Sequence, residues 1–371
     1  MLTSASGKSL TCPTPAAAIV GAMSAPPDLI RYWCAIAEIP TARQRTRIGT
    51  PDELLAAWRG SGQPALSMAH DQALGRWLDE GGRVLFRWDN DFPPTLLQIP
   101  DAPVALFAQG STEVLAQPRV ALVGSRAATP GGVGIARALA AELSQLGVLV
   151  VSGLAQGIDR AAHDGALAVN RPTLAIPGSG LANLYPRKHQ GLARSIIDCG
   201  GLLISEYPPW VAARAGLFPA RNRLISGLSV GVVVVQAALR SGSLITARLA
   251  AEQGREVMAV PGAPGIPVVA GCNQLLRDGA ALIESAQDVF YVCGWCWPET
   301  TSLSNQPQGG IATQGDAATQ PVLDALDSMP LSFDELQQHL GLSADRLEAA
   351  LVQLELLGRA ARTTHGYIRL L

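Results

Sequence analysis

Short apolar runs recur along the middle of the chain, and helical spacing fills most of the stretches between them. The runs are rich in valine, leucine and isoleucine, and they span 120–123, 148–151, 173–176, 202–204, 230–235 and 257–260. Continuous β-branched runs joined by helical crossovers are typical of a parallel sheet that is covered on both faces. The pattern therefore predicts an α/β domain with a mostly parallel sheet.

One intervening stretch, from Val133 to Leu146, has a clear helical period. Its apolar residues predict one buried face, made of Ile135, Ala138, Leu139, Leu143 and Leu146. We expect this face to pack on the sheet.

A short helical pattern precedes the sheet, between residues 28 and 81. Thr50, Pro51 and Glu53 are arranged as at a helix start, where a threonine caps the first turn and a proline occupies its first position. This predicts a small helical, SAM-like module over 27–82. The first 26 residues are expected to be a disordered leader. Alternatively, the start site is assigned too early, since Met23 stands just before the module.

The composition changes sharply between residues 299 and 319, where Ser, Gln, Gly, Ala and Thr dominate. This predicts a flexible linker. Beyond it, the pattern predicts three helices over 321–327, 332–339 and 343–357, with Ser332 and Glu335 as a capping box and Gly358 as a stop. Two short strands around a turn at 365–366 complete a winged helix over 320–371.

Composition narrows the class of protein. Of 371 residues, 48% are apolar and 16% are charged, and no run approaches the ~18 apolar residues of a membrane-spanning helix. The apolar content excludes disorder for most of the chain. Six cysteines in so long a chain do not indicate a disulfide framework, so we expect a cytoplasmic protein.

The net charge of −2 conceals a basic middle and an acidic end. Residues 119–261 hold 14 Lys and Arg against 7 Asp and Glu, whereas residues 320–371 hold 4 against 7. Nearly all of the cations are arginines, which suit bidentate phosphate contacts and base stacking.

Small or polar residues follow most of the predicted strands, for example at 124–126, 152–155, 177–180, 205–207 and 261–262. Because the carboxyl ends of parallel strands meet at one edge, where open α/β sheets bind ligands, these tips predict a site there.

Two clusters at this edge could carry chemistry, and each has a structural alternative. Gly124-Ser125-Arg126, with the glycines that open the next helix, is either a phosphate cradle or a turn that packs strand against helix. The stretch 218–223 places an aromatic residue beside two arginines, which suits single-stranded nucleic acid, although a buried Phe218 with solvated arginines explains it equally well. No Gly-x-Gly-x-x-Gly follows the first of these strands, which disfavours an NAD-dependent dehydrogenase.

Other polar pairs indicate structure rather than catalysis. Asp159 and His163 share a helix face, and a hydrogen bond between them is a better interpretation than acid–base chemistry. Cys293 and Cys296 fill only two of four zinc positions. Ser243 is expected to cap a helix. We therefore predict no catalytic residue, no metal and no cofactor.

Six motifs, in order and at similar spacing, resemble the DNA-processing protein A (DprA or Smf) family. They are VALVGSR (120–126), VVSGLAQGID (150–159), SEYPP (205–209), FPARNR (218–223), SGSLITAR (241–248) and REVMAVPG (255–262). The resemblance covers roughly residues 91 to 283.

The resemblance implies an extended Rossmann-like domain over 83–298 that binds single-stranded DNA without catalysing a reaction. Such proteins protect incoming DNA in natural transformation, load the RecA recombinase and form homodimers. Gly124, Ser125, Arg126 and the tip 178–180 would bind phosphate, Phe218 a base, and Arg221 and Arg223 the backbone. The full set of predicted nucleic-acid-binding residues is Gly124, Ser125, Arg126, Ser152, Gly153, Gly178, Ser179, Gly180, Lys188, Arg214, Phe218, Arg221, Asn222, Arg223, Arg240 and Arg248.

The chain departs from the family pattern in four places. Gln236 stands where a glutamate is usual, and the loop 210–217 lacks the usual prolines and lysine. The helical module has no Gly-x-Gly hairpin, so we expect no duplex-binding role for it. The third helix of the winged domain is acidic, which argues against DNA and predicts a protein–protein role.

Two further classes of protein are alternatives to a single-strand binder. A nucleotide-processing enzyme of the phosphoribohydrolase kind needs a Pro-Gly-Gly-x-Gly-Thr loop and a glutamate, where this chain has Pro177-Gly-Ser-Gly180 and Gln236. A transcription regulator needs a basic recognition helix. Nucleotide hydrolysis would favour the first of these classes, and duplex specificity the second.

Overall fold

The computed structural model describes residues 27–37, 48–63, 66–297, 319–326, 331–356, 359–363 and 366–369. The predicted leader, Gly358 and all of the predicted linker except Thr319 lie outside these residues, and their predictions stay untested. In the described part of the chain, no helix is long and apolar enough to cross a membrane.

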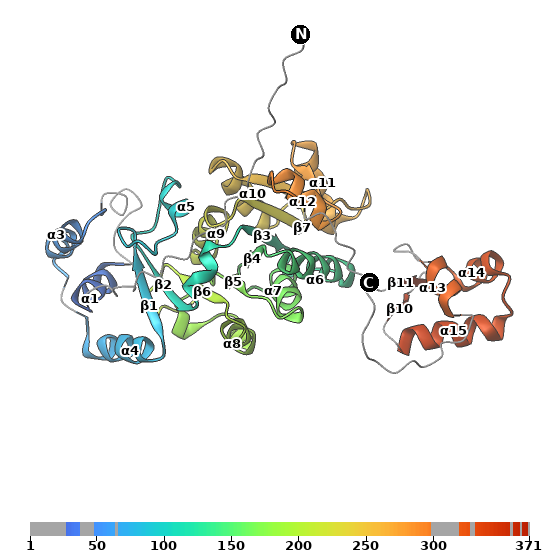
Figure 1. The fold of residues 1–371 in the computed structure, drawn as a ribbon, viewed down its shortest axis with the longest axis horizontal. Coiled ribbons are helices and arrows are strands. Elements are labelled where there is room, and N and C mark those ends of the chain that lie inside the picture. Colours follow the sequence, from blue (N-terminus) through green and yellow to red (C-terminus); the bar gives the residue numbers. More distant parts are fainter. Residues whose placement is uncertain are drawn as a thin grey trace, which may run out of the picture.

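A nine-stranded sheet forms the centre of the protein, in the order β1-β2-β6-β5-β4-β3-β7-β8-β9 (Figure 1). From β6 to β9 along this order, all neighbouring strands are parallel. These strands are β3 (Arg119–Gly124), β4 (Leu149–Ser152), β5 (Thr173–Ala175), β6 (Leu202–Ser205), β7 (Gly231–Gln236), β8 (Glu256–Ala259) and β9 (Ala281–Leu282). All six predicted strands are therefore confirmed, whereas β9 and the two strands at the other edge of the sheet, β1 and β2, were not predicted.

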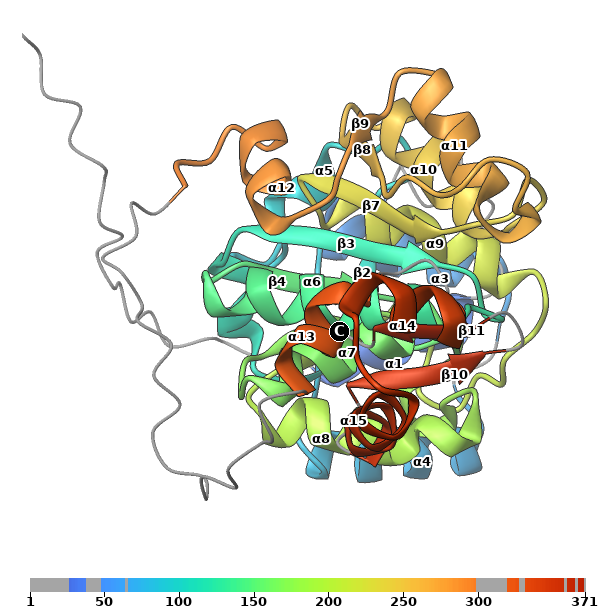
Figure 2. The same cartoon turned by 90° about the vertical axis from the view of Figure 1, so that its right-hand side faces the viewer.

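Helices cover both faces of the sheet because successive strand residues point to opposite sides. In β3, Val120 and Leu122 join a core with α6 (Pro130–Gln145), α7 (Ile158–Ala168) and α12 (Ala286–Val292). Ala121 and Val123 join a second core with α9 (Leu217–Gly227), α10 (Ser243–Glu252) and α11 (Ala270–Arg277). Figure 2 shows β3 and β7 side by side in the middle of the sheet. The predicted α/β Rossmann-like fold is confirmed.

The helical module packs on the antiparallel edge of the sheet. Its helices are α1 (Pro27–Ile36), α3 (Pro51–Ser61) and α4 (Met68–Asp79), and the edge strands are β1 (Gly82–Phe86) and β2 (Ala105–Gly110). Trp33 and Trp77 are buried, and the Trp77 ring meets Phe107 of β2 edge-on at 5.8 Å between centroids. Module and sheet edge thus share one core, and the predicted capping box at Thr50 and Glu53 is confirmed.

Short elements complete this part of the chain. They are α5 (Pro94–Leu97), α8 (Gln190–Asp198) and the 3₁₀ turns η1 (Thr112–Ala116), η2 (Leu181–Asn183), η3 (Arg187–His189) and η4 (Pro267–Val269). Helix α8 packs on β5 and β6 from the same side as α7.

The C-terminal residues form a separate core with winged-helix elements. Helices α13 (Thr319–Ala325), α14 (Phe333–Leu340) and α15 (Ala344–Leu356) precede an antiparallel hairpin of β10 (Ala360–Thr363) and β11 (Gly366–Arg369). Leucines from all three helices meet in this core. Ser332 and Glu335 form the predicted capping box. The predicted winged helix is confirmed.

The buried face of α6 differs from the prediction. Ile135 and Ala138 are exposed, and the helix instead buries Gly132, Ala136, Leu139, Ala140 and Leu143. Small residues occupy this face because α6 and α7 approach each other closely. A Cβ at Gly165 of α7 would lie 2.2 Å from the carbonyl oxygen of Arg137 in α6. Leu139 and Leu143 were predicted correctly.

His163 is buried in α7 and does not bond to Asp159, so that prediction was wrong. Its Nδ1 lies 2.9 Å from the Thr173 hydroxyl, which itself donates to the carbonyl of Val150. The hydroxyl proton is therefore in use, and Nδ1 of a neutral imidazole donates to the oxygen. Burial lowers the pKa of His163 to about 3.

This burial predicts a pH-dependent loss of stability. Below pH ~6.5 the unfolded chain takes up a proton at residue 163 that the native protein does not, so the free energy of unfolding falls as the pH drops from ~6.5 toward 3, by up to about 1.4 kcal/mol per pH unit. His163→Gln should remove this slope in urea unfolding across that range. His339→Gln, in exposed α14, is the matched control, and an unchanged slope in His163→Gln would contradict the assignment.

Candidate nucleic-acid interface

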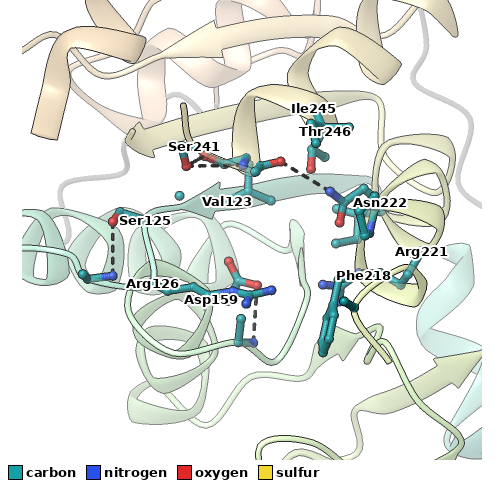
Figure 3. Close-up of a pocket in the computed structure, with 18 residues that line it drawn as sticks. Val123, Ser125, Arg126, Asp159, Phe218, Arg221, Asn222, Ser241, Ile245 and Thr246 are labelled. Carbon is teal, nitrogen blue, oxygen red and sulfur yellow. Dashed lines mark hydrogen bonds between the residues drawn. The ribbon is translucent and has the colours of Figure 1, made fainter. Parts of the chain in front are cut away.

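A cavity of about 580 Å³ opens at the carboxyl edge of the sheet. It is lined by the loop after β3, the start of α7 and the first turns of α9 and α10. Figure 3 shows these side chains converging from different elements. Of the predicted residues, it brings together Gly124, Ser125, Arg126, Phe218, Arg221 and Asn222.

The loop after β3 interlocks with the start of α7. A Cβ at Gly124 would lie 2.5 Å from the Ile158 side chain, and Gly157 has a positive φ of 75°. The amide of Ile158 donates to the carbonyl of Ser125 at 3.2 Å. Only glycine allows this close approach, which fixes Ser125 and Arg126 at the rim of the cavity.

Gln236 holds the far side of the same loop. Its Oε1 accepts from the amide of Thr129 at 2.8 Å, and its Nε2 donates to the Thr129 hydroxyl at 2.9 Å. The hydroxyl in turn caps α6 by accepting from the amide of Gly132. An amide side chain supplies both the donor and the acceptor, which a carboxylate would not. Packing therefore explains Gly132, since a Cβ there would lie 2.8 Å from the Gln236 side chain, but not Gly134, where a Cβ would meet nothing within 4 Å.

Arg126 and Phe218 meet at the rim of the cavity. The guanidinium carbon of the exposed Arg126 lies 4.9 Å from the centroid of the Phe218 ring, which is a cation–π contact. Gly178 leaves room for the ring, since a Cβ there would lie 2.6 Å from Phe218 Cδ1. Phe218 is half-buried, so the core does not absorb it. An aromatic face beside an exposed cation suits a base with its phosphate.

Arg221 lies beneath this rim and is almost fully buried. Its Nη1 donates to the carbonyls of Gly153, at 2.7 Å, and Ile176. Burial lowers the pKa of the Arg221 guanidinium to about 10, so it stays charged at neutral pH. Burial raises the pKa of the neighbouring Asp159 carboxyl, and the Arg221 charge opposes that rise. Arg221 thus ties strand ends together, and its charge reaches the cavity from below.

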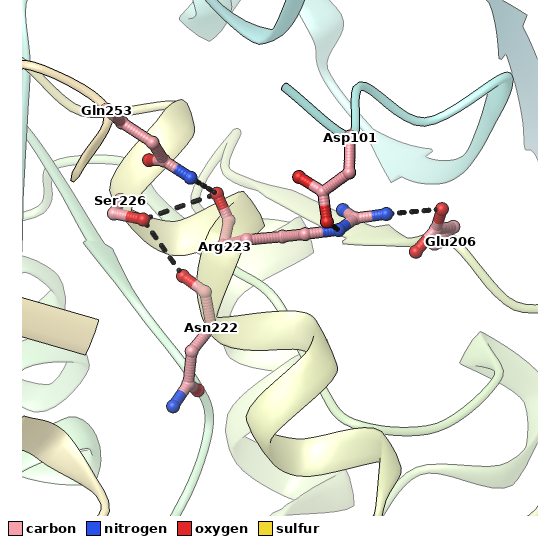
Figure 4. A network of polar contacts seen from close by, with 6 residues as sticks. All are labelled: Asp101, Glu206, Asn222, Arg223, Ser226 and Gln253. Atoms are coloured by element: carbon pink, nitrogen blue, oxygen red, sulfur yellow. Dashed lines mark hydrogen bonds and ion pairs between the residues drawn. The ribbon is translucent and has the colours of Figure 1, made fainter. Parts of the chain in front are cut away.

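Arg223 is engaged elsewhere and does not line the cavity. Its Nη2 lies 2.6 Å from Glu206 Oε1, and its Nε lies 2.8 Å from Asp101 Oδ2. Figure 4 shows the guanidinium between the two carboxylates. The side chains of Arg223 and Glu206 are only 9% and 2% exposed. The structure therefore does not favour the predicted backbone contact by Arg223, whose guanidinium pairs with the buried Glu206 instead.

The start of α10 forms the opposite wall. Asn222 Nδ2 reaches the carbonyl of Gly242, and the hydroxyls of Ser241 and Ser243 bond to each other at 2.7 Å. Ser243 is the first residue of the helix rather than its cap, which is Gly242 without a side-chain bond. The prediction that Ser243 caps the helix was wrong. The Ser243 hydroxyl bonds to the Ser241 hydroxyl instead of to a backbone amide of the first turn.

The structure does not bring the remaining predicted residues to the cavity lining, in three different ways. Ser152, Gly153, Ser179 and Gly180 are buried, and a Cβ at Gly180 would lie 2.0 Å from the carbonyl oxygen of Pro208. Gly178 is also buried and supports Phe218. Among the predicted residues, the cations that are exposed but outside the lining are Lys188, Arg214, Arg240 and Arg248.

Sequence reasoning missed several residues of this site. Thr129 carried a signal, since it precedes Pro130 as an N-cap precedes a proline at the first helical position. Ile245 and Thr246 line the cavity from α10, and Tyr185 contacts Phe218 from a loop. Ile245 and Thr246 lie inside the motif 241–248, which could have indicated them, whereas Tyr185 belongs to none of the six motifs.

Comparison with known proteins gives consistent matches. A family model described as DNA recombination-mediator protein A matches residues 83–294, and a DprA winged helix domain matches residues 306–366. Protein Smf of Escherichia coli (strain K12) is 40% identical over 308 residues, which are 79% of this chain and 79% of that protein.

Two solved structures are similar as well. DNA processing protein A from Streptococcus pneumoniae has a TM-score of 0.57 at 34% identity, covering 71% of this chain and 90% of that one. A structure on the single-stranded DNA binding mode of DNA processing protein A from Helicobacter pylori has a TM-score of 0.51 at 32% identity, covering 57% and 94%.

The buried ion pair beside the cavity should contribute to stability. Arg223→Met removes the guanidinium that pairs with the buried Glu206 and should lower the free energy of unfolding by about 3 kcal/mol. Combining it with Glu206→Leu should restore part of this loss. Urea unfolding of the unchanged protein, the two single variants and the double variant measures the effect. Arg248→Met changes an exposed arginine and should cost less than about 0.5 kcal/mol. Equal effects of the two arginine variants would contradict a structural role.

Proposed function

Because this chain belongs to the DprA/Smf family, we propose that it binds single-stranded DNA at the cavity, with a base on Phe218 and the backbone at Arg126, Ser125 and Gly124. The observation that carries this proposal is the contact between an exposed arginine and a half-buried aromatic ring at the rim of the cavity. Base–aromatic stacking and cationic contacts are the two terms of sequence-tolerant single-strand binding.

The base enters between the Phe218 ring and Arg126. Arg126 is exposed, so its side chain can move away from the ring and pair with the adjoining phosphate. Arg221 adds a fixed positive charge to the lining of the same cavity. Buried cations are weakly screened by salt, whereas the contact with Arg126 is screened strongly.

We propose that this function is non-enzymatic. The alternative of a nucleotide-processing enzyme needs a base at the position of Gln236, whose amide is engaged with Thr129 on both sides. His163, the histidine nearest in sequence to Asp159, bonds to Thr173 inside the core. Release of the free nucleobase from nucleoside monophosphates, when they are incubated with the protein, would favour the enzyme instead.

We further propose that the protein protects incoming DNA and loads RecA during natural transformation, and that it acts as a homodimer. For the winged helix we keep the protein–protein role. Asp345, Glu348 and Glu355 are exposed on α15, which disfavours a phosphate-facing recognition helix. Anisotropy of labelled RecA should rise on adding this protein, and duplex binding by the winged helix would contradict the assignment.

Phe218→Ala should weaken binding to a labelled oligothymidylate by about 1–3 kcal/mol, because it removes one base-stacking platform. Fluorescence anisotropy measures the affinity, and a matched duplex should bind more weakly than the single strand. Phe218→Tyr keeps the aromatic face and is the control. Equal affinity for duplex and single strand would contradict the proposal.

Arg126→Ala should act differently, through salt dependence. Loss of one phosphate contact should reduce the slope of log affinity against log salt by about 0.7 for a single strand. Arg137→Ala removes an exposed arginine of α6 outside the cavity and should leave the slope unchanged. A slope that stays the same in Arg126→Ala would place the phosphate contact elsewhere.

A further inference from the structure

We propose that Tyr185 is a second base-stacking residue, which takes the nucleotide next to the one on Phe218 and admits only a strand whose bases are unstacked between the two rings. This inference rests on the proposed function, because it concerns the same bound strand. It adds a residue outside the cavity lining and a preference among single-stranded sequences.

Tyr185 is an aromatic residue exposed beside the cavity. Its ring is 52% exposed, and its centroid lies 5.8 Å from that of Phe218. Phe218 therefore meets two side chains at the rim, a cation from Arg126 and the ring of Tyr185. When one base lies on Phe218, the next nucleotide on the Tyr185 side therefore meets a second aromatic ring.

The backbone around Tyr185 is anchored on both sides. Before it, Asn183 Nδ2 donates to the carbonyl of Trp210, and the amide of Ala182 donates to Pro209 at 3.0 Å. After it, the buried His189 places Nδ1 2.8 Å from the carbonyl of Leu154. An exposed ring on an anchored loop is pre-organised, so that a base binds it at little cost in loop entropy.

The angle between the rings limits what can bind. The planes of Tyr185 and Phe218 are inclined by 61°. Neighbouring bases in a stacked strand are parallel, so two of them cannot lie flat on both rings. The strand must unstack and turn between the two nucleotides. Single-strand binders prefer some sequences over others because strands differ in stacking strength and backbone flexibility. Adenine runs stack more strongly than thymine runs, so they unstack less readily. This geometry therefore favours binding of thymine runs.

Two cations follow Tyr185 closely in the chain. Arg187 and Lys188 are exposed on η3, directly after the Tyr185–Pro186 step. A single strand is held by cations on its backbone while its bases stack on aromatic side chains. Arg187 and Lys188 are therefore candidates to contact the phosphates beside a base on Tyr185.

The test compares labelled oligothymidylate and oligoadenylate of equal length, and thymidylates of increasing length, by fluorescence anisotropy. Tyr185→Leu should weaken thymidylate binding about tenfold and adenylate binding less, so that the ratio between them falls. The loss should appear only once the oligonucleotide is long enough to span both rings. Tyr185→Phe should bind like the unchanged protein, and Tyr291→Leu, at a tyrosine 87% exposed on α12, is the matched control.

A second readout places the stacked bases directly. With 2-aminopurine moved stepwise along a thymidylate, fluorescence should be quenched at two neighbouring positions in the unchanged protein and at one in Tyr185→Leu. An equal loss for both sequences and at the shortest lengths would overturn the inference, because Tyr185 would then only support Phe218. Unchanged thymidylate affinity would overturn it too. Failure of the unchanged protein to bind any single strand would instead overturn the proposed function itself.

Discussion

A single buried arginine holds the carboxyl edge of the sheet together. Arg221 donates to carbonyls at the ends of β4 and β5 from a helix that follows neither strand, and it lies against the Asp159 carboxyl at the start of α7. Removing a charge from water is costly unless hydrogen bonds and an opposite charge compensate. This requirement fixes α9 against the strand ends, and with it the position of Phe218.

The remaining contacts of the site follow from that placement. Once α9 is fixed, the ring of Phe218 lies over Gly178 and beneath Arg126, and Arg223, two residues after Arg221, reaches Glu206 and Asp101 on another side of the helix. One helix therefore serves the core and the cavity at once. Its first turn presents an aromatic face, and the next turn holds the buried ion pairs. Binding chemistry and stability are separated along the helix by a few residues.

The sequence allowed much of this to be predicted, for identifiable reasons. Uninterrupted β-branched runs located all six predicted strands, because strands covered on both faces have no polar side. Of the five predicted strand tips, residues 124–126 and Ala155 line the cavity, whereas 177–180, 205–207 and 261–262 do not. The structural role of Arg223 could not be predicted from the sequence, because its partners Asp101 and Glu206 come from distant parts of the chain. The face of α6 was mispredicted because close helix contact selects small residues over large apolar ones. Tyr185 lacked any periodic pattern.

The most direct test is to locate bound DNA on the protein by photocrosslinking. A thymidylate with 5-iododeoxyuridine at single positions would be irradiated with the full chain, and the crosslinked peptides identified by mass spectrometry. Binding at the cavity predicts crosslinks in the peptide that carries Phe218, lost on competition with unlabelled single strand. Crosslinks confined to residues 319–369, or spread over the exposed Arg240 and Arg248 without Phe218, would contradict it.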